Sequence, residues 1–199
     1  MDHYQIISRS FQSTIENIAQ SVDTLAEPVG RACELMVQAL LEDRKIIACG
    51  NGVDGALAQL FNCHLLSRFE QERPALPALT LNSDGTSLTA IAQTGGLNDI
   101  YSRQLRALGQ AGDVLLCISS AGEANNLLRA VQAAHEREMA VVVLSSATDG
   151  ELGTLLQQDD VEIRVDSLQR PRVIELHTMT IHCLCELIEY RLFGINKAE

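Results

Sequence analysis

The sequence predicts an α/β fold: a three-layer α/β/α sandwich around a five-stranded, parallel, doubly wound sheet, preceded by extra N-terminal helices. Short apolar runs alternate with helical segments along the chain. Most of these runs are rich in Val, Ile and Leu without polar alternation, which is typical of strands buried on both faces of a parallel sheet. A length of 199 residues fits one domain with a sizeable core. We therefore expect a single domain over 1–199, with helices over 1–43 and the sandwich and a long final helix over 44–199.

Apolar residues at helical spacing predict a helix over 4–26. A second helix is expected from Pro28 to Leu41, because proline is tolerated in the first turn of a helix. The apolar stripes of these helices could supply an interface between subunits or cover one face of the sheet. Both alternatives remain open.

The rest of the chain alternates between expected strands and expected helices. The strands are expected at 45–50, 77–82, 113–119, 140–146 and 161–165, and the helices near 54–69, 86–108 (broken at Gly95–Gly96), 123–137, 149–157 and 171–193. In open α/β sheets, ligands bind beyond the carboxyl ends of the strands. A functional site is therefore expected at this edge.

Composition and charge exclude several classes of protein. A net charge of −11 with only 15 Lys and Arg argues against direct nucleic-acid binding. The first ten residues lack the pattern of a signal peptide, and no apolar run reaches the length of a membrane span. We therefore expect a cytoplasmic protein without a membrane contact. Most of the six cysteines lie inside apolar runs, where a thiol acts as a small core residue.

Two strand ends carry residues suited to binding an anion. The first continues into Asn51, Gly52, Val53 and Asp54, and the second into Ser119, Ser120 and Ala121; each then meets a helix. Free N–H groups at a helix start attract phosphate, and serine hydroxyls add donors. Neither loop matches a P-loop or a complete G-x-G-x-x-G fingerprint. Each loop alone could be an ordinary turn, but two of them on one sheet favour a ligand site.

Four segments carry a resemblance to a known family: CGNG before a helix, RFEQERPALPA, LNDIYSRQLRALGQAGDVLLCISSAG, and a late helix with the pattern E-x-H-x-x-x-x-H-C-L-C-E-L-I-E. Together they resemble the SIS (sugar isomerase) domain family, and within it the phosphoheptose isomerase branch, over nearly the whole chain. That branch includes sedoheptulose-7-phosphate isomerases of lipopolysaccharide heptose synthesis and DiaA-like proteins that associate with the replication initiator DnaA. The resemblance implies a homotetramer and a phosphosugar ligand. The implied binding residues are Asn51, Gly52, Val53, Asp54, Gln93, Thr94, Ser119, Ser120 and Ala121.

The resemblance also implies a catalytic set, which this sequence does not complete. The family's metal-binding His and Gln fall on Leu60 and Ile174, and its catalytic Glu falls on His64, whereas its late His is kept as His182. A functional zinc site has at least three protein ligands, so zinc is disfavoured. If the chain is an enzyme, His64 and His182 are the candidate proton-transfer residues. As an alternative, His64 is a packing residue on an apolar helix face.

The implied phosphate loops are altered as well. Family serines fall on Ala121, Ala124 and Asp54, and an Asn-Asp pair falls on Gln93-Thr94. A carboxylate at a helix start competes for the N–H groups that a phosphate would use and repels the dianion. Alternatively, Asp54 is simply a helix N-cap.

These changes favour a DiaA-like homotetramer with a degraded active site that acts as an assembly factor for DnaA. Leu192 and Phe193, at the end of the last helix, are the candidate partner-binding residues, although both could instead pack on the core or a subunit interface. An alternative is a phosphoheptose isomerase that uses His64 and His182. Another is a phosphosugar-binding regulator without catalysis.

Overall fold

The computed structural model describes residues 2–122, 124–148 and 150–194. Its centre is a five-stranded, entirely parallel sheet of strand order β2-β1-β3-β4-β5. The strands are β1 (Ile46–Gly50), β2 (Ala78–Thr80), β3 (Val114–Ile118), β4 (Ala140–Ser146) and β5 (Val161–Val165). The predicted fold class and all five strand positions are therefore confirmed.

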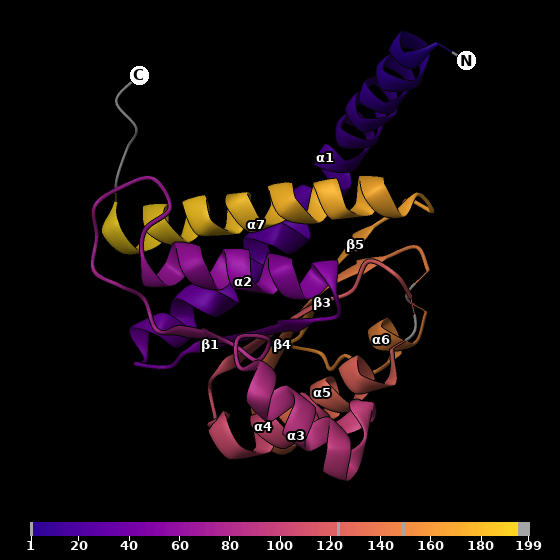
Figure 1. Cartoon of the computed structure of the whole chain (residues 1–199). Coiled ribbons are helices and arrows are strands. Elements are labelled where there is room, and N and C mark those ends of the chain that lie inside the picture. Colours follow the sequence, from indigo (N-terminus) through magenta and orange to yellow (C-terminus); the bar gives the residue numbers. More distant parts are fainter. Residues whose placement is uncertain (1, 123, 149, 195–199) are drawn as a thin grey trace.

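Helices cover both faces of the sheet (Figure 1). The helices are α1 (His3–Leu41), α2 (Val53–Leu66), α3 (Gly85–Gly95), η1 (Leu97–Asp99), α4 (Ser102–Leu108), α5 (Asn125–Glu136), α6 (Gly150–Thr154) and α7 (Arg170–Phe193). Strand residues alternate between two hydrophobic cores. In β1, for example, Ile46 and Ala48 pack with α1, α2 and α7, whereas Ile47 and Cys49 pack with α4, α5 and α6.

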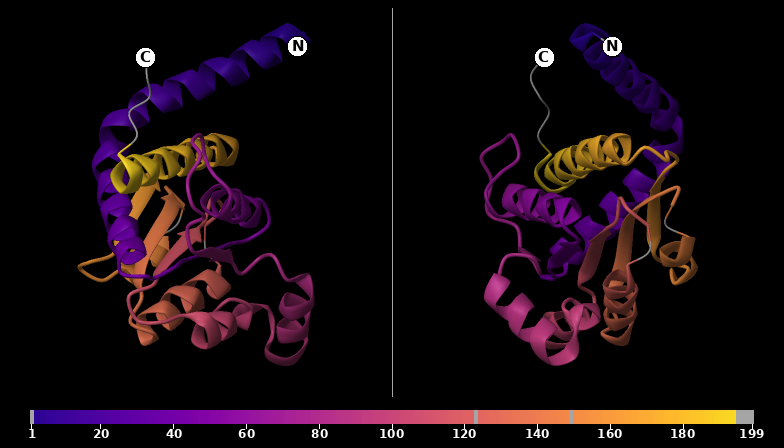
Figure 2. Two further views of the ribbon diagram at one scale, coloured as in Figure 1. Left: turned by 90° about the vertical axis from the view of Figure 1, so that its left-hand side faces the viewer. Right: turned by 45° about the vertical axis from the view of Figure 1, so that its right-hand side comes forward.

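The N-terminal region differs from the prediction. One continuous helix, α1, replaces the two expected helices, and Pro28 lies inside it. The residues after Pro28 are held in place by the core, with Val29, Ala32 and Met36 buried, so the missing N–H of Pro28 does not end the helix. The N-terminal half of α1 projects from the body of the molecule (Figure 2). It carries exposed apolar side chains at Tyr4, Ile6, Ile7, Phe11, Ile15 and Val22.

Other boundaries follow the sequence closely. The predicted break at Gly95–Gly96 is confirmed, since α3 ends at Gly95 and Gly96 adopts a left-handed φ of 86°. Four cysteines are buried in the core as expected, but Cys63 and Cys183 are exposed. Across the described ranges, no helix combines the length and the apolar character that crossing a membrane requires.

Candidate functional site

The first loop turns sharply from β1 into α2. Gly52 is the N-cap of α2 and has a positive φ of 57°, which favours glycine. A Cβ on Gly50 would lie 2.6 Å from the backbone of Asp54, so the chain passes too close for any other residue there. Val53 is exposed and Asn51 is half-buried at the loop surface. The glycines therefore bring the start of α2 close to the end of β1.

The second loop buries both of its serines after β3. Ser119 and Ser120 are each 2% exposed, whereas Ala121 is exposed. The Ser119 hydroxyl donates to the carbonyl of Gly122 at 3.4 Å, and the Ser120 hydroxyl accepts from Arg170 Nε at 3.3 Å. Arg170 is the first residue of α7, so a cationic side chain reaches this loop from the last helix.

Side chains join the two loops to each other. Asn51 and Asn126 exchange two amide hydrogen bonds of 2.9 and 2.8 Å. Asp54, which is 2% exposed, accepts from the backbone N–H of Ser120 through Oδ2 at 3.0 Å. Its Oδ1 is buried and has no hydrogen-bond partner among the described residues. The interpretation of Asp54 as an N-cap is wrong, because Gly52 holds that position and the Asp54 side chain turns toward the neighbouring strand end.

A buried tyrosine that the sequence analysis missed supports the first loop from below. The Tyr101 hydroxyl donates to the Gly50 carbonyl at 2.6 Å and lies 3.2 Å from Asn51 Oδ1. Asn82, at the end of β2, donates to the same carbonyl and to the Tyr101 oxygen. Burial raises the pKa of Tyr101 to about 12, so the phenol stays protonated and keeps its donor at neutral pH. Its position in the LNDIYSR segment was the one available signal.

Two predicted binding residues lie apart from these loops. Gln93 and Thr94 are exposed on the last turn of α3. The Thr94 hydroxyl donates back to the carbonyls of Ala90 and Ile91, and neither side chain bonds to the described residues of either loop. The structure therefore brings together Asn51, Asp54 and Ser120 but does not join Gln93 and Thr94 to them.

The two candidate histidines meet, although they are far apart in the sequence. His64 lies near the end of α2 and His182 in the middle of α7, with ring centroids 5.7 Å apart and ring planes at 75°. The Phe69 ring contacts both, at 5.0 Å from His64 and 5.5 Å from His182. His64 Nε2 is buried with no hydrogen-bond partner in the described structure.

The environment of His64 lowers its pKa. Burial is the largest cause, and it outweighs a backbone hydrogen bond at Arg68 that acts in the opposite direction. The neighbouring His182 also disfavours a positive charge on His64. His64 is therefore neutral at pH 7, which is the form that can accept a proton. The packing interpretation and the chemical one both fit this position, since the ring is half-buried among apolar neighbours.

The donor set does not fit zinc. Leu60 and Ile174 are partly buried and pack against the core, and neither side chain has a donor atom. In the residues that the structure describes, no three His, Cys, Asp or Glu side chains are grouped to hold a metal ion. His64 and His182 alone supply fewer ligands than a zinc site in a protein requires.

Three other residues considered in the sequence lie on α7: His177, Leu192 and Phe193. His177 is fully buried, and its Nε2 lies 3.0 Å from the Ser145 carbonyl, in keeping with a structural role. Leu192 and Phe193 are half-buried and pack against the core cluster beneath α7. The apolar end of α7 is therefore largely used within the subunit.

The chain is similar to known proteins along its whole length. Residues 10–146 match the SIS domain family. A phosphoheptose isomerase from Chromohalobacter salexigens is 45% identical over 197 residues, which cover 99% of this chain and 100% of that protein. A phosphoheptose isomerase from Coxiella burnetii is 43% identical over 197 residues, covering 99% of both chains.

The solved structures agree with the sequence relatives. The phosphoheptose isomerase GmhA from Neisseria gonorrhoeae superimposes with a TM-score of 0.90 at 37% identity, over 94% of this chain and 99% of that one. A phosphoheptose isomerase from Francisella tularensis gives a TM-score of 0.91 at the same identity, over 94% of this chain and 98% of that one. The chain belongs to the SIS domain family, in its phosphoheptose isomerase branch.

Proposed function

We propose that this protein is an aldose–ketose isomerase of a phosphorylated heptose, with sedoheptulose 7-phosphate as its substrate and His64 and His182 as its proton-transfer pair. The observation that carries the proposal is the contact between the two imidazole rings on α2 and α7, whose centroids are 5.7 Å apart. The activity named for its full-length relatives, 43–46% identical to this chain, supports the same reaction. This proposal reverses the preference that the altered loops alone suggested.

The chemistry needs what these side chains can supply. Isomerisation moves a proton between adjacent carbons through an enediol, so one group removes the proton from carbon and returns it to the neighbouring carbon. A second group protonates and deprotonates the sugar oxygens. The neutral His64 suits the first role, because its lowered pKa leaves one ring nitrogen unprotonated at pH 7. His182 is the group beside it that suits the second.

We expect His64→Ala and His182→Ala each to lower kcat on sedoheptulose 7-phosphate by about 100- to 10,000-fold, the usual contribution of a positioned acid or base. The assay uses the purified wild type and both variants, with and without added zinc, and His3→Ala as a control at an exposed site on α1. Turnover that needs no zinc would agree with the incomplete donor set. No turnover by the wild type would contradict the proposed activity, and unchanged turnover in both variants would place the chemistry elsewhere.

A second candidate function is a non-catalytic, DiaA-like assembly factor that binds DnaA. One observation favours it: the Asp54 carboxylate already occupies the Ser120 N–H, which opposes a phosphate at that position. Against it, Leu192 and Phe193 are half-buried in their own subunit. The test is capture of purified DnaA by the wild type, and its loss in Leu192→Ala or Phe193→Ala. Absence of capture by a wild type that turns over the sugar phosphate would exclude this function.

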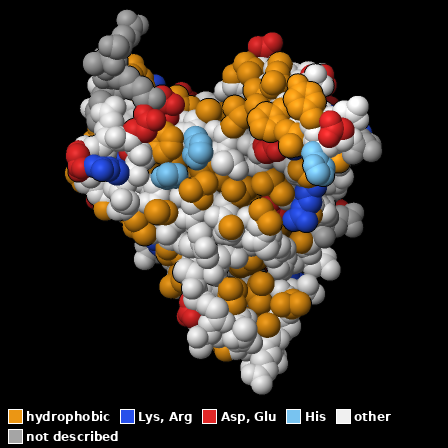
Figure 3. Space-filling view, turned by 45° about the horizontal axis from the view of Figure 1, so that its top comes forward, with side chains coloured by type: hydrophobic (Ala, Val, Ile, Leu, Met, Phe, Trp, Pro, Cys, Tyr) orange, Lys and Arg blue, Asp and Glu red, His pale blue; other side chains and the backbone are white. Residues whose placement is uncertain are grey.

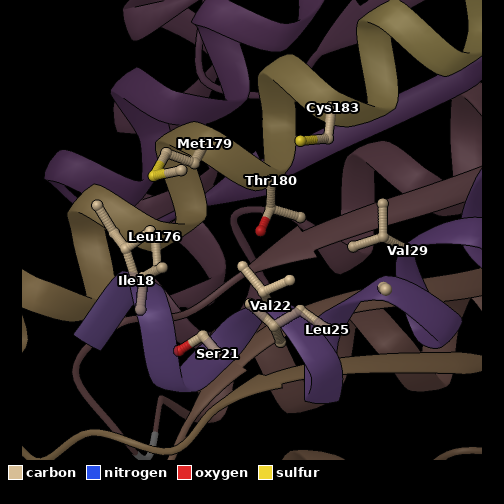
Figure 4. Close-up of a pocket in the computed structure, with 10 residues that line it drawn as sticks. Ile18, Ser21, Val22, Leu25, Val29, Leu176, Met179, Thr180 and Cys183 are labelled. Carbon is tan, nitrogen blue, oxygen red and sulfur yellow. The ribbon is translucent and has the colours of Figure 1, made fainter. Parts of the chain in front are cut away.

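We also propose that the protein is a homotetramer in solution, as its family resemblance implies. The exposed apolar residues on the projecting half of α1 support association between copies. Figure 3 shows apolar side chains gathered on the side of the molecule that carries α7 and α1. An apolar cavity of about 220 Å³ lies between these helices, lined among others by Val22, Leu25 and Met179 (Figure 4).

Placing a charge on the projecting stripe is expected to separate the subunits. We expect Phe11→Glu to lower the mass measured by light scattering, because the buried carboxylate would have no partner in an apolar interface. Glu16→Gln, at an exposed position on the same helix, is the control and should keep the wild-type mass. A wild type with the mass of one chain would refute the tetramer.

A further inference from the structure

Residues 67–77, which join α2 to β2, wrap around the ends of α2 and α7 (Figure 1). This segment contains the RFEQERP sequence, and its Phe69 and Arg73 bond to residues of α2 and α7. Its two central features are a buried guanidinium and an aromatic ring that reaches the histidine pair. One carboxylate from α7 accepts hydrogen bonds from this guanidinium and from the backbone N–H of the aromatic residue.

Arg73 closes the end of α2. Its side chain is 1% exposed and donates to the His64 carbonyl at 2.6 Å and the Leu65 carbonyl at 2.9 Å. The last carbonyls of a helix have no partner within the helix. A cation at that end also interacts favourably with the negative end of the helix dipole. The backbone of His64 is therefore bonded directly to Arg73.

Glu189 is the partner that fixes both the arginine and the loop. Its carboxylate accepts from Arg73 Nε at 2.7 Å, and its side chain is 5% exposed. The same group accepts the backbone N–H of Phe69 at 2.9 Å and that of Glu70 at 3.4 Å. Glu189 lies seven residues beyond His182, about two turns along the same face of α7. One carboxylate thus ties the histidine of α7 to the loop that covers the histidine of α2.

We propose that Arg73, Glu189 and Phe69 are positioning residues that hold His64 against His182. The proposal rests on the isomerase function proposed above. The ion pair fixes the end of α2 relative to α7, and the bonded loop backbone lays the Phe69 ring against both imidazoles. Displacing a reacting group by about 1 Å can cost about 100-fold in rate, so such a clamp matters beyond stability.

The test uses Arg73→Lys and Phe69→Ser. Lysine keeps the charge facing Glu189, but its single nitrogen cannot take the three positions from which Nε, Nη1 and Nη2 of Arg73 donate. Serine at position 69 removes the ring from the histidines without touching the ion pair. Leu66→Ser, at a site that is 48% exposed on the same helix end, is the matched control, and Phe69→Leu is the conservative variant that keeps an apolar cover.

Two readouts distinguish positioning from a purely structural role. By NMR, we expect both variants to weaken the cross-relaxation between the ring protons of His64 and His182, which reports the distance between the two rings. In the assay, we expect kcat to fall about 10- to 100-fold with little change in KM, because these residues lie outside the phosphate loops. Phe69→Leu should recover part of the loss, and Leu66→Ser should resemble the wild type.

Folded Arg73→Lys and Phe69→Ser proteins that keep the wild-type cross-relaxation between the two rings would overturn the proposal. If Arg73→Lys does not fold, Phe69→Ser decides, because Phe69 is only half-buried in a loop. A wild type without turnover would refute the isomerase function but not the positioning. The NMR readout would still report whether the clamp holds the two rings together.

Discussion

Replacing Asp54 with serine is expected to raise the affinity for inorganic phosphate by about 10- to 100-fold, or about 1.4–2.8 kcal/mol. Asp54 now accepts the Ser120 N–H through Oδ2 and places a carboxylate between the two loops. A serine frees that N–H and removes a like charge next to the phosphate. It also adds a hydroxyl donor at the start of α2, where the helix dipole favours an anion.

Titration calorimetry of wild type and variant with inorganic phosphate measures this difference. Asp54→Asn separates the two causes, since its amide oxygen can still accept the Ser120 N–H but carries no charge. Asp84→Ser is the matched control: Asp84 also accepts N–H groups at a helix start near the carboxyl ends of the strands, but it is exposed and caps α3. Equal affinities for wild type and Asp54→Ser would show that the carboxylate does not limit phosphate binding. In that case the hydrogen bond between Asp54 and Ser120 would no longer favour the non-catalytic function.

The sheet could be predicted because each strand carries its own local signal. Val114–Ile118 and residues 140–144 are continuous apolar runs of strand length, which is typical of strands buried on both faces of a sheet. The break at Gly95–Gly96 is equally local. In contrast, Pro28 is a local signal for the start of a helix, and tertiary packing overrides it. The residues after Pro28 pack in the core together with residues of the sheet, and α1 continues through the proline. The sequence alone therefore divided one helix into two.

The candidate site was predictable only in part, because only some of its features are local in the sequence. Glycines and serines after two strands indicate the loops, and the edge of a parallel sheet brings such loops together. The contacts that define the site join residues distant in the chain: Asp54 to Ser120, His64 to His182, and Arg73 to Glu189. No periodicity encodes such a pair. RFEQERP was visible as a motif, but its meaning depends on Glu189, which is 116 residues away from Arg73.

Removing Glu189 is expected to have the largest effect on stability. We expect Glu189→Ala to lower the free energy of unfolding by about 3–5 kcal/mol, because it leaves the buried guanidinium of Arg73 without its counter-charge and two loop N–H groups without an acceptor. Urea denaturation followed by circular dichroism measures the change. Glu34→Ala is the control: it breaks an exposed ion pair with Arg191 that also joins α1 to α7, and it should cost less than about 1 kcal/mol.

The pH dependence of this effect has a definite sign. Burial by itself raises the pKa of Glu189, but the N–H of Phe69, the Arg73 side chain and the N–H of Glu70 outweigh it, so the pKa lies below the ordinary value. A carboxyl with a lowered pKa stabilises the fold above its unfolded-state pKa of about 4.3 and loses that contribution as the pH falls through its folded pKa. The difference in the free energy of unfolding between wild type and Glu189→Ala should therefore be largest at pH 7 and become smaller under acid conditions. A difference that does not change from pH 7 to acid would contradict the ion-pair explanation.

The same pair separates stability from positioning. Replacing both members of a buried ion pair with apolar residues of similar volume is often neutral or stabilising, whereas removing one member is not. We therefore expect the double variant Arg73→Met with Glu189→Leu to recover the part of the stability that Glu189→Ala loses through the uncompensated charge of Arg73. It cannot recover the bonds to the His64 carbonyl or to the Phe69 N–H. A double variant that is stable but low in kcat would show that the charges are kept for the geometry of the two histidines. One that restores both stability and kcat would show that filling the space is enough.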